Sequence, residues 1–167
     1  GFSHHMPILA LFPEGVDTQT LNFHLAGGDA TLVAQSPTLL IEAETGHLVP
    51  HWVELDAMAD DLARQALILR PFEPLHDDTR YIVAFHGLRT PLGDSIAPPL
   101  GFAHLLRGDV AGHPVLEPLA ARYEDHIFPV LDDLGLDRAH LTLAWDFTTA
   151  TEERNTRDLL AVRDHVL

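Results

Sequence analysis

The sequence predicts a mainly β fold, an antiparallel β-sandwich, followed by a helical C-terminal segment. Between Thr38 and Pro99, short apolar runs alternate with turns that contain Gly, Pro and Asp, which is typical of antiparallel strands. From Leu100 onward the apolar residues recur mainly with helical spacing. We therefore expect a sandwich over residues 1–99 and a helical extension over residues 100–167, which packs on the sandwich or on a domain outside this sequence.

The strands of the first half are identified by alternation and by residue type. The segment from Val49 to Leu55 alternates with a period of two, so that His51 and Val53 share one face while Trp52 and Glu54 share the other. The same criteria, with β-branched and aromatic residues as the second signal, predict strands at residues 6–12, 22–25, 31–34, 38–43, 49–55, 66–70 and 80–86.

The second half is predicted as helices with one further strand. Apolar residues form a stripe along a helix over Val115–Leu134. Pro129 is expected to kink that helix and Gly135 to end it. Alternating apolar residues predict a last strand at Leu141–Phe147, and a final helix is expected from about residue 150 to 166.

The composition excludes several classes of function. The formal net charge is -15, with 25 acidic against 10 basic residues, and all the basic residues are Arg. Such a surface repels phosphate backbones and anionic lipids, so no nucleic acid is expected as a partner. The chain has no Cys, which excludes disulfides, thiolate metal sites and a Cys nucleophile. The 12 His residues are scattered along the chain and predict a response to pH near neutrality.

The ends of the sequence suggest a piece of a longer polypeptide. No signal peptide is visible at Gly1, and no apolar stretch is long enough to insert into a membrane as a helix. The first residues, GFSHHMPILALFP, have the character of the middle of a chain, and the last residues, RDHVL, fall inside a helical pattern. We therefore expect further sequence on either side.

One short motif resembles the blocks of GDS-type esterases. Gly93-Asp94-Ser95 is followed by Asp137 and His140 with the spacing DxxH. In such an enzyme the Ser would be the nucleophile, the His its base and the Asp the group that orients the His. The alternative is that Gly93-Asp94 is a turn pair, because these residues lie among prolines in a connection between strands.

A second candidate site is a possible metal site. Imidazole and carboxylate groups fall within ten positions of one another at His47, His51, Glu54 and Asp56. If the segment is a strand, however, His51 points away from Glu54. The alternative is that His51 is a packed residue and that Glu54 pairs with Arg64 or Arg70.

Asp146 is a third polar residue of interest because it lies on a strand between Trp145 and Phe147. We expect its carboxylate to accept backbone N–H groups and so to tie the last strand to a turn.

Four segments also carry a family resemblance by their residue order: LFPEGVDTQTLN, TGHLVPHWVELDA, QALILRPFEPLHDDTRYIVAFHGLRTPLGDSIAPP and LTLAWDFTTAT. Together they resemble a region of large secreted or lipid-anchored bacterial proteins that precedes an α/β-hydrolase domain of lipase or esterase type. Residues 6–99 also resemble the Ig-like domains of bacterial surface proteins. The GxSxG segment of the hydrolase is absent from this sequence, so no catalytic residue carries over.

The resemblance implies an Ig-like accessory module that is not catalytic, found outside the cytoplasm in a secreted or surface protein. The implied partner is the rest of the parent polypeptide, its hydrolase domain, and no cofactor is expected. A homodimer through the stripe of Val115–Leu134 is a further expectation if that stripe is exposed. Two alternatives remain: a metal- or ligand-binding module that uses the segment His47–Asp56, and a small esterase that uses Ser95, Asp137 and His140.

Overall fold

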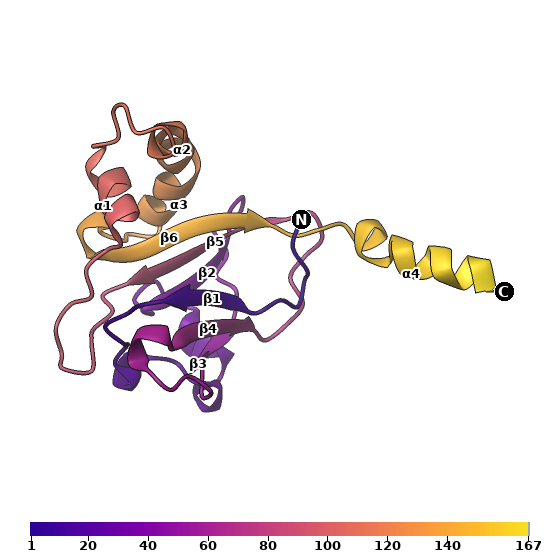
Figure 1. Cartoon of the computed structure of the whole chain (residues 1–167), viewed down its shortest axis with the longest axis horizontal. Coiled ribbons are helices and arrows are strands. Elements are labelled where there is room, and N and C mark those ends of the chain that lie inside the picture. The colour runs from indigo at the N-terminus through magenta and orange to yellow at the C-terminus, as the bar shows by residue number, and fades with distance from the viewer. Residues whose placement is uncertain (167) are drawn as a thin grey trace.

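Two antiparallel sheets of three strands each form the centre of the fold (Figure 1). The computed structural model describes residues 1–166, apart from the side chains at positions 152, 155 and 158. One sheet has the order β1 (Ile8–Leu11), β4 (Ala66–Pro71), β3 (His51–Leu55). The other has the order β2 (Thr38–Glu42), β5 (Arg80–His86), β6 (Leu141–Thr148). The fold is thus strand-rich with added helices, and the strands predicted near these six positions are confirmed.

The two sheets pack face to face over an apolar core. The core includes Ile8, Phe12, Val53, Leu67, Leu69, Val83 and Phe85. Alternation along each strand of the β1-β4-β3 sheet sends every second side chain into this core, as with Ile8 and Ala10, which are buried, whereas Leu9 and Leu11 are exposed. The β1-β4-β3 sheet therefore has one buried face and one accessible face.

The outer face of the β2-β5-β6 sheet is covered by helices α1 (Leu100–Arg107), α2 (Leu116–Arg122) and α3 (Phe128–Asp133) (Figure 1). A second apolar cluster joins Ile41 and Ile82 of that sheet to Phe102, Phe128 and Leu131 of the helices. This sheet is covered on both sides, which explains why five successive residues of β5 are buried. Most of the apolar stripe predicted over Val115–Leu134 packs in this second cluster. The buried residues of the stripe are therefore not available as a dimer surface.

The predicted helix over residues 115–134 is interrupted near Pro129, as expected, and the interruption is a π-helical turn. Helix α2 ends at Arg122, one π-helical turn follows at Tyr123–Ile127, and α3 then begins with Pro129 in its first turn. Pro129 has no N–H to donate to the carbonyl four residues earlier, and a π turn is one way in which a helix accommodates such a break. Gly135, with a φ of 76°, ends the helical segment as predicted.

Two predicted strands, at residues 22–25 and 31–34, are wrong. The chain forms 3-10 turns at His24–Ala26 and Gly28–Thr31 instead, after an earlier turn at Thr18–Thr20. Residues 32–34 continue in bends and a turn. Local bonds satisfy the backbone, for example from Ala26 N to the Phe23 carbonyl at 2.8 Å. Gly27 adopts a φ of 77° between the two turns and breaks any extended run.

The prediction for Asp146 is also wrong, because its carboxylate has other hydrogen-bond partners than expected. Its side chain is only 6% exposed and accepts hydrogen bonds from guanidinium groups rather than from the backbone. Arg122 donates through Nε at 2.9 Å and Nη2 at 2.6 Å, and Arg80 donates through Nη1 at 3.4 Å. Asp146 therefore fastens the end of α2 to β6 and β5.

Helix α4 (Glu152–Val166) follows β6 and projects away from the sheets (Figure 1). Its first turn is capped by Thr151, whose Oγ1 accepts the backbone N–H of Arg154 at 3.2 Å. Within the described part of the chain, none of the helices has the length and apolar character needed to cross a membrane.

Candidate functional site

The accessible face of the β1-β4-β3 sheet carries a group of exposed and half-buried side chains. We call this surface the open face; strand register places on it Leu9, Leu11, Ile68, Arg70, Trp52 and Glu54. Leu9 is 57% exposed and Leu11 is 50% exposed. One half of the open face, along β1, is thus apolar, and the other half, along β3, combines an aromatic ring with charges.

Trp52 and Arg70 form the centre of the charged half. They lie directly opposite each other on β3 and β4, so their side chains share one face. The Arg70 Cζ atom lies 5.8 Å from the centre of the Trp52 ring, within the range of a cation–π contact. Arg70 Nε also donates to Glu54 Oε1 at 2.6 Å, which confirms one of the two partners predicted for Glu54. Because both charged side chains are more than one-third exposed, the ion pair contributes at most about 1 kcal/mol.

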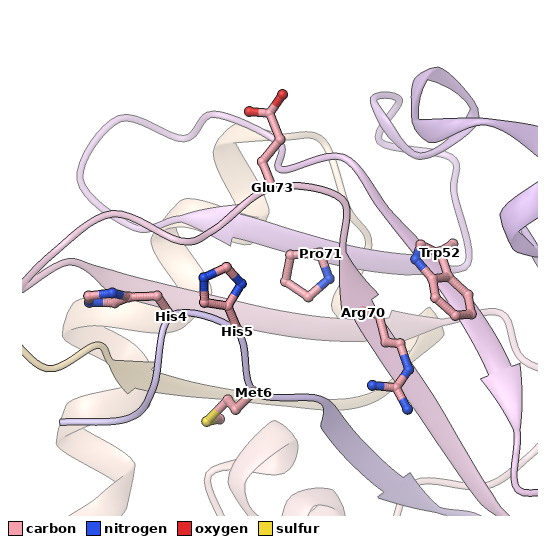
Figure 2. Close-up of a pocket in the computed structure, with 7 residues that line it drawn as sticks. All are labelled: His4, His5, Met6, Trp52, Arg70, Pro71 and Glu73. Carbon is pink, nitrogen blue, oxygen red and sulfur yellow. The ribbon is translucent and has the colours of Figure 1, made fainter. Parts of the chain in front are cut away.

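A pocket of about 170 Å³ adjoins this group, where β4 ends and the N-terminal segment passes by. Its lining is drawn in Figure 2 and consists of His4, His5, Met6, Trp52, Arg70, Pro71 and Glu73. In Figure 2 Pro71 lies between the His5 ring and the Trp52 indole, while the Glu73 carboxylate points outward. The pocket offers ring faces together with both donors and acceptors, a mixture suited to a polar partner with apolar patches.

His4 fixes the N-terminal wall of this pocket. Its Nε2 atom lies 2.7 Å from the carbonyl oxygen of Ala150 and 2.8 Å from Oδ1 of Asp77. Both neighbours are acceptors, so Nε2 carries a proton and donates to them. The backbone of the same residue accepts the N–H of Leu75 at 3.1 Å. The wall is therefore built from three segments that are far apart in the sequence.

The residues of the esterase hypothesis have separate structural roles. Ser95 is exposed on the loop after β5 and forms an isolated bridge with Arg89. Asp137 caps a 3-10 turn by accepting the N–H of Ala139 at 2.8 Å, and the backbone carbonyl of His140 accepts the N–H of Gly87 at 2.9 Å. Among the described residues, no hydrogen bond joins the Ser95, Asp137 and His140 side chains to one another.

The turn alternative for Gly93-Asp94 fits the observed backbone. The N–H of Thr90 donates to the Asp94 carbonyl at 2.8 Å, and the N–H of Gly93 donates to the Thr90 carbonyl at 2.8 Å. Gly93 has a φ of 91°, a conformation that only Gly adopts without strain.

The four residues of the metal hypothesis do not converge. His51 is fully buried, and its ring nitrogens contact Val49 O at 2.8 Å and Thr38 Oγ1 at 2.9 Å. Glu54 points to the open face toward Arg70, and Asp56 accepts the N–H of Met58 at 2.9 Å. His47 is exposed in the turn after β2. Across the described residues, no group of three or more His, Cys, Asp and Glu side chains is arranged to hold a metal ion.

Burial also changes the chemistry of His51. Desolvation lowers the pKa of this imidazole below its usual 6.5, although its hydrogen bonds act in the opposite direction. The carbonyl of Val49 can only accept, so Nδ1 carries the proton of the neutral ring and Nε2 accepts from the Thr38 hydroxyl. His51 thus acts as a buried structural residue, as the packing alternative predicts.

Neither the pocket nor the pairing of Trp52 with Arg70 was predicted from the sequence. The alternation of β3 correctly placed Trp52 with Glu54, but only the register with β4 brings Arg70 beside them. Comparison with known proteins finds no matching family model and no matching curated sequence. Any function proposed for the chain therefore depends on the residues themselves and on the resemblance of the four quoted segments.

Proposed function

We propose that this chain is an Ig-like sandwich that serves as a non-catalytic accessory module of a larger bacterial hydrolase of lipase or esterase type, secreted or held at the cell surface. Two packed antiparallel sheets are compatible with an Ig-like architecture. The resemblance of the quoted segments supports the setting. The separate structural roles of Ser95, Asp137 and His140 favour a binding role over a catalytic one.

The observation that carries the proposal is the group of Trp52, Arg70 and Glu54, which is partly exposed beside the pocket. Trp and Arg are the residues most often found as energetic centres of protein interfaces, because both combine a large contact area with polar groups. Here a sheet holds them in a fixed arrangement, so little side-chain freedom is lost on binding. We propose that the hydrolase domain of the parent polypeptide contacts this half of the open face.

The test is a binding measurement between this chain and the separately produced hydrolase domain from the same reading frame. We expect Trp52→Ala and Arg70→Ala each to raise the dissociation constant about tenfold or more, as for residues at the centre of an interface. Leu92→Ala is the matched control, because Leu92 is exposed on the loop after β5 and does not line the pocket. If all three variants bind the hydrolase domain as tightly as the native chain does, the proposed contact is wrong.

A second assay addresses catalysis directly. The purified chain is expected to leave short-chain nitrophenyl esters unhydrolysed. If it hydrolyses them, and Ser95→Ala abolishes that activity while folding is unchanged, the accessory role is wrong and the esterase hypothesis replaces it.

A further inference from the structure

Strands β1, β3, β2 and β6 lie at the edges of the two sheets, and β1 differs from the other three. On the outer edge of β3, the N–H of Val53 donates to the Asn22 carbonyl at 3.0 Å. The segment 47–49 bonds to β2, and on β6 the Thr148 carbonyl accepts the N–H of Phe2 at 2.9 Å. For β1, no backbone hydrogen bond within the described part of the chain leads to any segment other than β4. The outer edge of β1 is therefore open.

The pairing of β3 with β4 shows which way the backbone groups of β4 point. Along a strand inside an antiparallel sheet, successive residues bond alternately to one neighbouring strand and to the other. The N–H of Val53 donates away from β4, so the next residue, Glu54, bonds toward β4, where its partner is Ile68. Ile68 is thus bonded to β3, and the residues before and after it are bonded to β1.

The same alternation identifies the free backbone groups of β1. Ile8 and Ala10 are the partners of the two β4 residues that bond to β1, so Leu9 and Leu11 direct their N–H and C=O groups outward. Their side chains are also exposed, by 57% and 50%. Proteins commonly protect an open edge with charged side chains, but residues 6–12, MPILALF, include no ionisable side chain. The edge is thus free to accept another strand.

The backbone groups and the charge of β1 both fit a second copy of the same strand. If Ala10 lies opposite Ala10 of another copy in an antiparallel pair, Leu9 lies opposite Leu11. Each outward N–H of these two residues then meets an outward C=O, and no outward group of either strand is left unpaired. The chain has a formal net charge of -15, so most of its surface repels another copy. Strand β1 can pair with itself without placing like charges opposite each other.

We propose that two copies of this chain form a dimer by antiparallel pairing of β1 with β1, with a two-fold axis at Ala10. The two β1-β4-β3 sheets then join into one sheet, and the Leu9 and Leu11 side chains of both copies form one apolar strip on its open face. Stable complexes bury about 1,200–2,000 Å², more than two four-residue strands offer, so we expect a reversible dimer. The proposal does not depend on the function proposed above, because Trp52 and Arg70 lie outside the contact.

Sedimentation velocity of the 167-residue chain over a range of concentrations tests the pairing. The acidic variant is Leu9→Glu with Leu11→Glu, and the basic variant is Leu9→Lys with Leu11→Lys. Both positions are exposed in the single chain, so both variants are expected to fold, which circular dichroism checks. Leu92→Glu is the control, because Leu92 is exposed and lies outside β1.

We expect the native chain and the Leu92→Glu control to dimerise reversibly. Their dimers should become tighter as salt is added, because salt screens the repulsion between two acidic copies. Each double variant alone should be monomeric, since like charges would then face each other across the pair of strands. An equimolar mixture of the acidic and basic variants should form a dimer again, because each Glu then faces a Lys.

The register has a test of its own in Ala10→Cys. The chain has no Cys, so the new thiol can form a disulfide only with its equivalent in another copy. Residues that face each other in a non-hydrogen-bonded antiparallel pair have Cα atoms about 4.5 Å apart, which a disulfide can span. With oxidised glutathione we expect a covalent dimer of Ala10→Cys. Leu92→Cys, with an exposed thiol outside the contact, should cross-link much less at the same concentration.

A native chain that is still monomeric at about 1 mM overturns the proposal. So does an acidic variant that dimerises as the native chain does, because the contact would then lie elsewhere, and so does a mixture that stays monomeric. If Ala10→Cys cross-links no better than Leu92→Cys, the strands do not pair in this register and the proposal is wrong. Trp52→Ala should leave the dimer intact, which separates failure of this proposal from failure of the hydrolase contact.

Discussion

The imidazole of His51 and the hydroxyl of Thr38 share a buried hydrogen bond of 2.9 Å that joins the two sheets. His51 begins β3 in one sheet and Thr38 begins β2 in the other. The backbone N–H of His51 also donates to Thr31 Oγ1 at 3.1 Å, so this corner of the sandwich is polar but satisfied. A satisfied polar contact inside an apolar core favours one alignment of the sheets over others.

Thr38→Val should destabilise the fold because it removes the only side-chain donor to His51 Nε2 among the described residues. The shape of the side chain is kept, but a buried acceptor is left unpaired. We expect the free energy of unfolding in urea to fall by about 1–3 kcal/mol. Thr18→Val, at an exposed position, is the control and should change it by less than about 0.5 kcal/mol. Equal effects of the two substitutions would mean that the bond between the sheets contributes nothing.

The buried imidazole of His51 should make the stability of the fold depend on pH. Its pKa is lowered in the folded state, so the unfolded chain takes up this proton first as the pH falls below 6.5. The stabilising contribution is therefore complete above pH 6.5 and is lost as the pH falls through the folded pKa. Titration of the His51 ring by NMR should show a folded pKa below 6.5. In His51→Gln the free energy of unfolding should depend less steeply on pH, by the equivalent of up to one bound proton. An unchanged slope would mean that His51 does not cause the pH dependence.

The two Tyr residues should resist ionisation. Burial raises the pKa of Tyr81 and raises that of Tyr123 to about 12, helped in the second case by the charge of Asp146. The neutral hydroxyl of Tyr123 donates to the Ala144 carbonyl at 2.7 Å. Their stabilising contribution is present below the ordinary pKa of about 10 and is lost as the pH rises through the folded values.

Ultraviolet absorbance of tyrosinate measures this directly. At pH 10 the folded chain should show little tyrosinate, whereas the chain in urea should be about half ionised. Tyr123→Phe leaves Tyr81 as the only Tyr and assigns the remaining signal. A folded chain that is half ionised at pH 10 would mean that neither ring is protected.

The sequence was most informative where a strand is covered on both sides or alternates strictly. The segment 80–86 was predicted with the observed bounds because residues 81–85 form an uninterrupted apolar and aromatic run between Arg80 and His86. The side chains of β3 were assigned to the correct faces by their period of two. The segment 22–25 was wrong because four residues of alternation fit a 3-10 turn equally well. The pocket was beyond prediction, since it depends on His4 bonding to Ala150, 146 residues away in the chain, and on the register that sets Arg70 opposite Trp52.

The helical layer should prove to be part of one cooperative unit with the sandwich. Phe128 is fully buried between α3 and the β2-β5-β6 sheet, with its ring 5.5 Å from that of Tyr123. Phe128→Ala is expected to cost about 3–5 kcal/mol, and Phe128→Leu less. Because Trp52 lies in β3 and Trp145 in β6, Trp fluorescence reports on both sheets, and it should show the loss at the same urea concentration as far-ultraviolet circular dichroism. Leu119→Ala, at a partly exposed position of α2, is the control and should have a small effect. If the helices unfold in a separate transition before the sheets, residues 100–140 form a unit that unfolds independently of the sandwich.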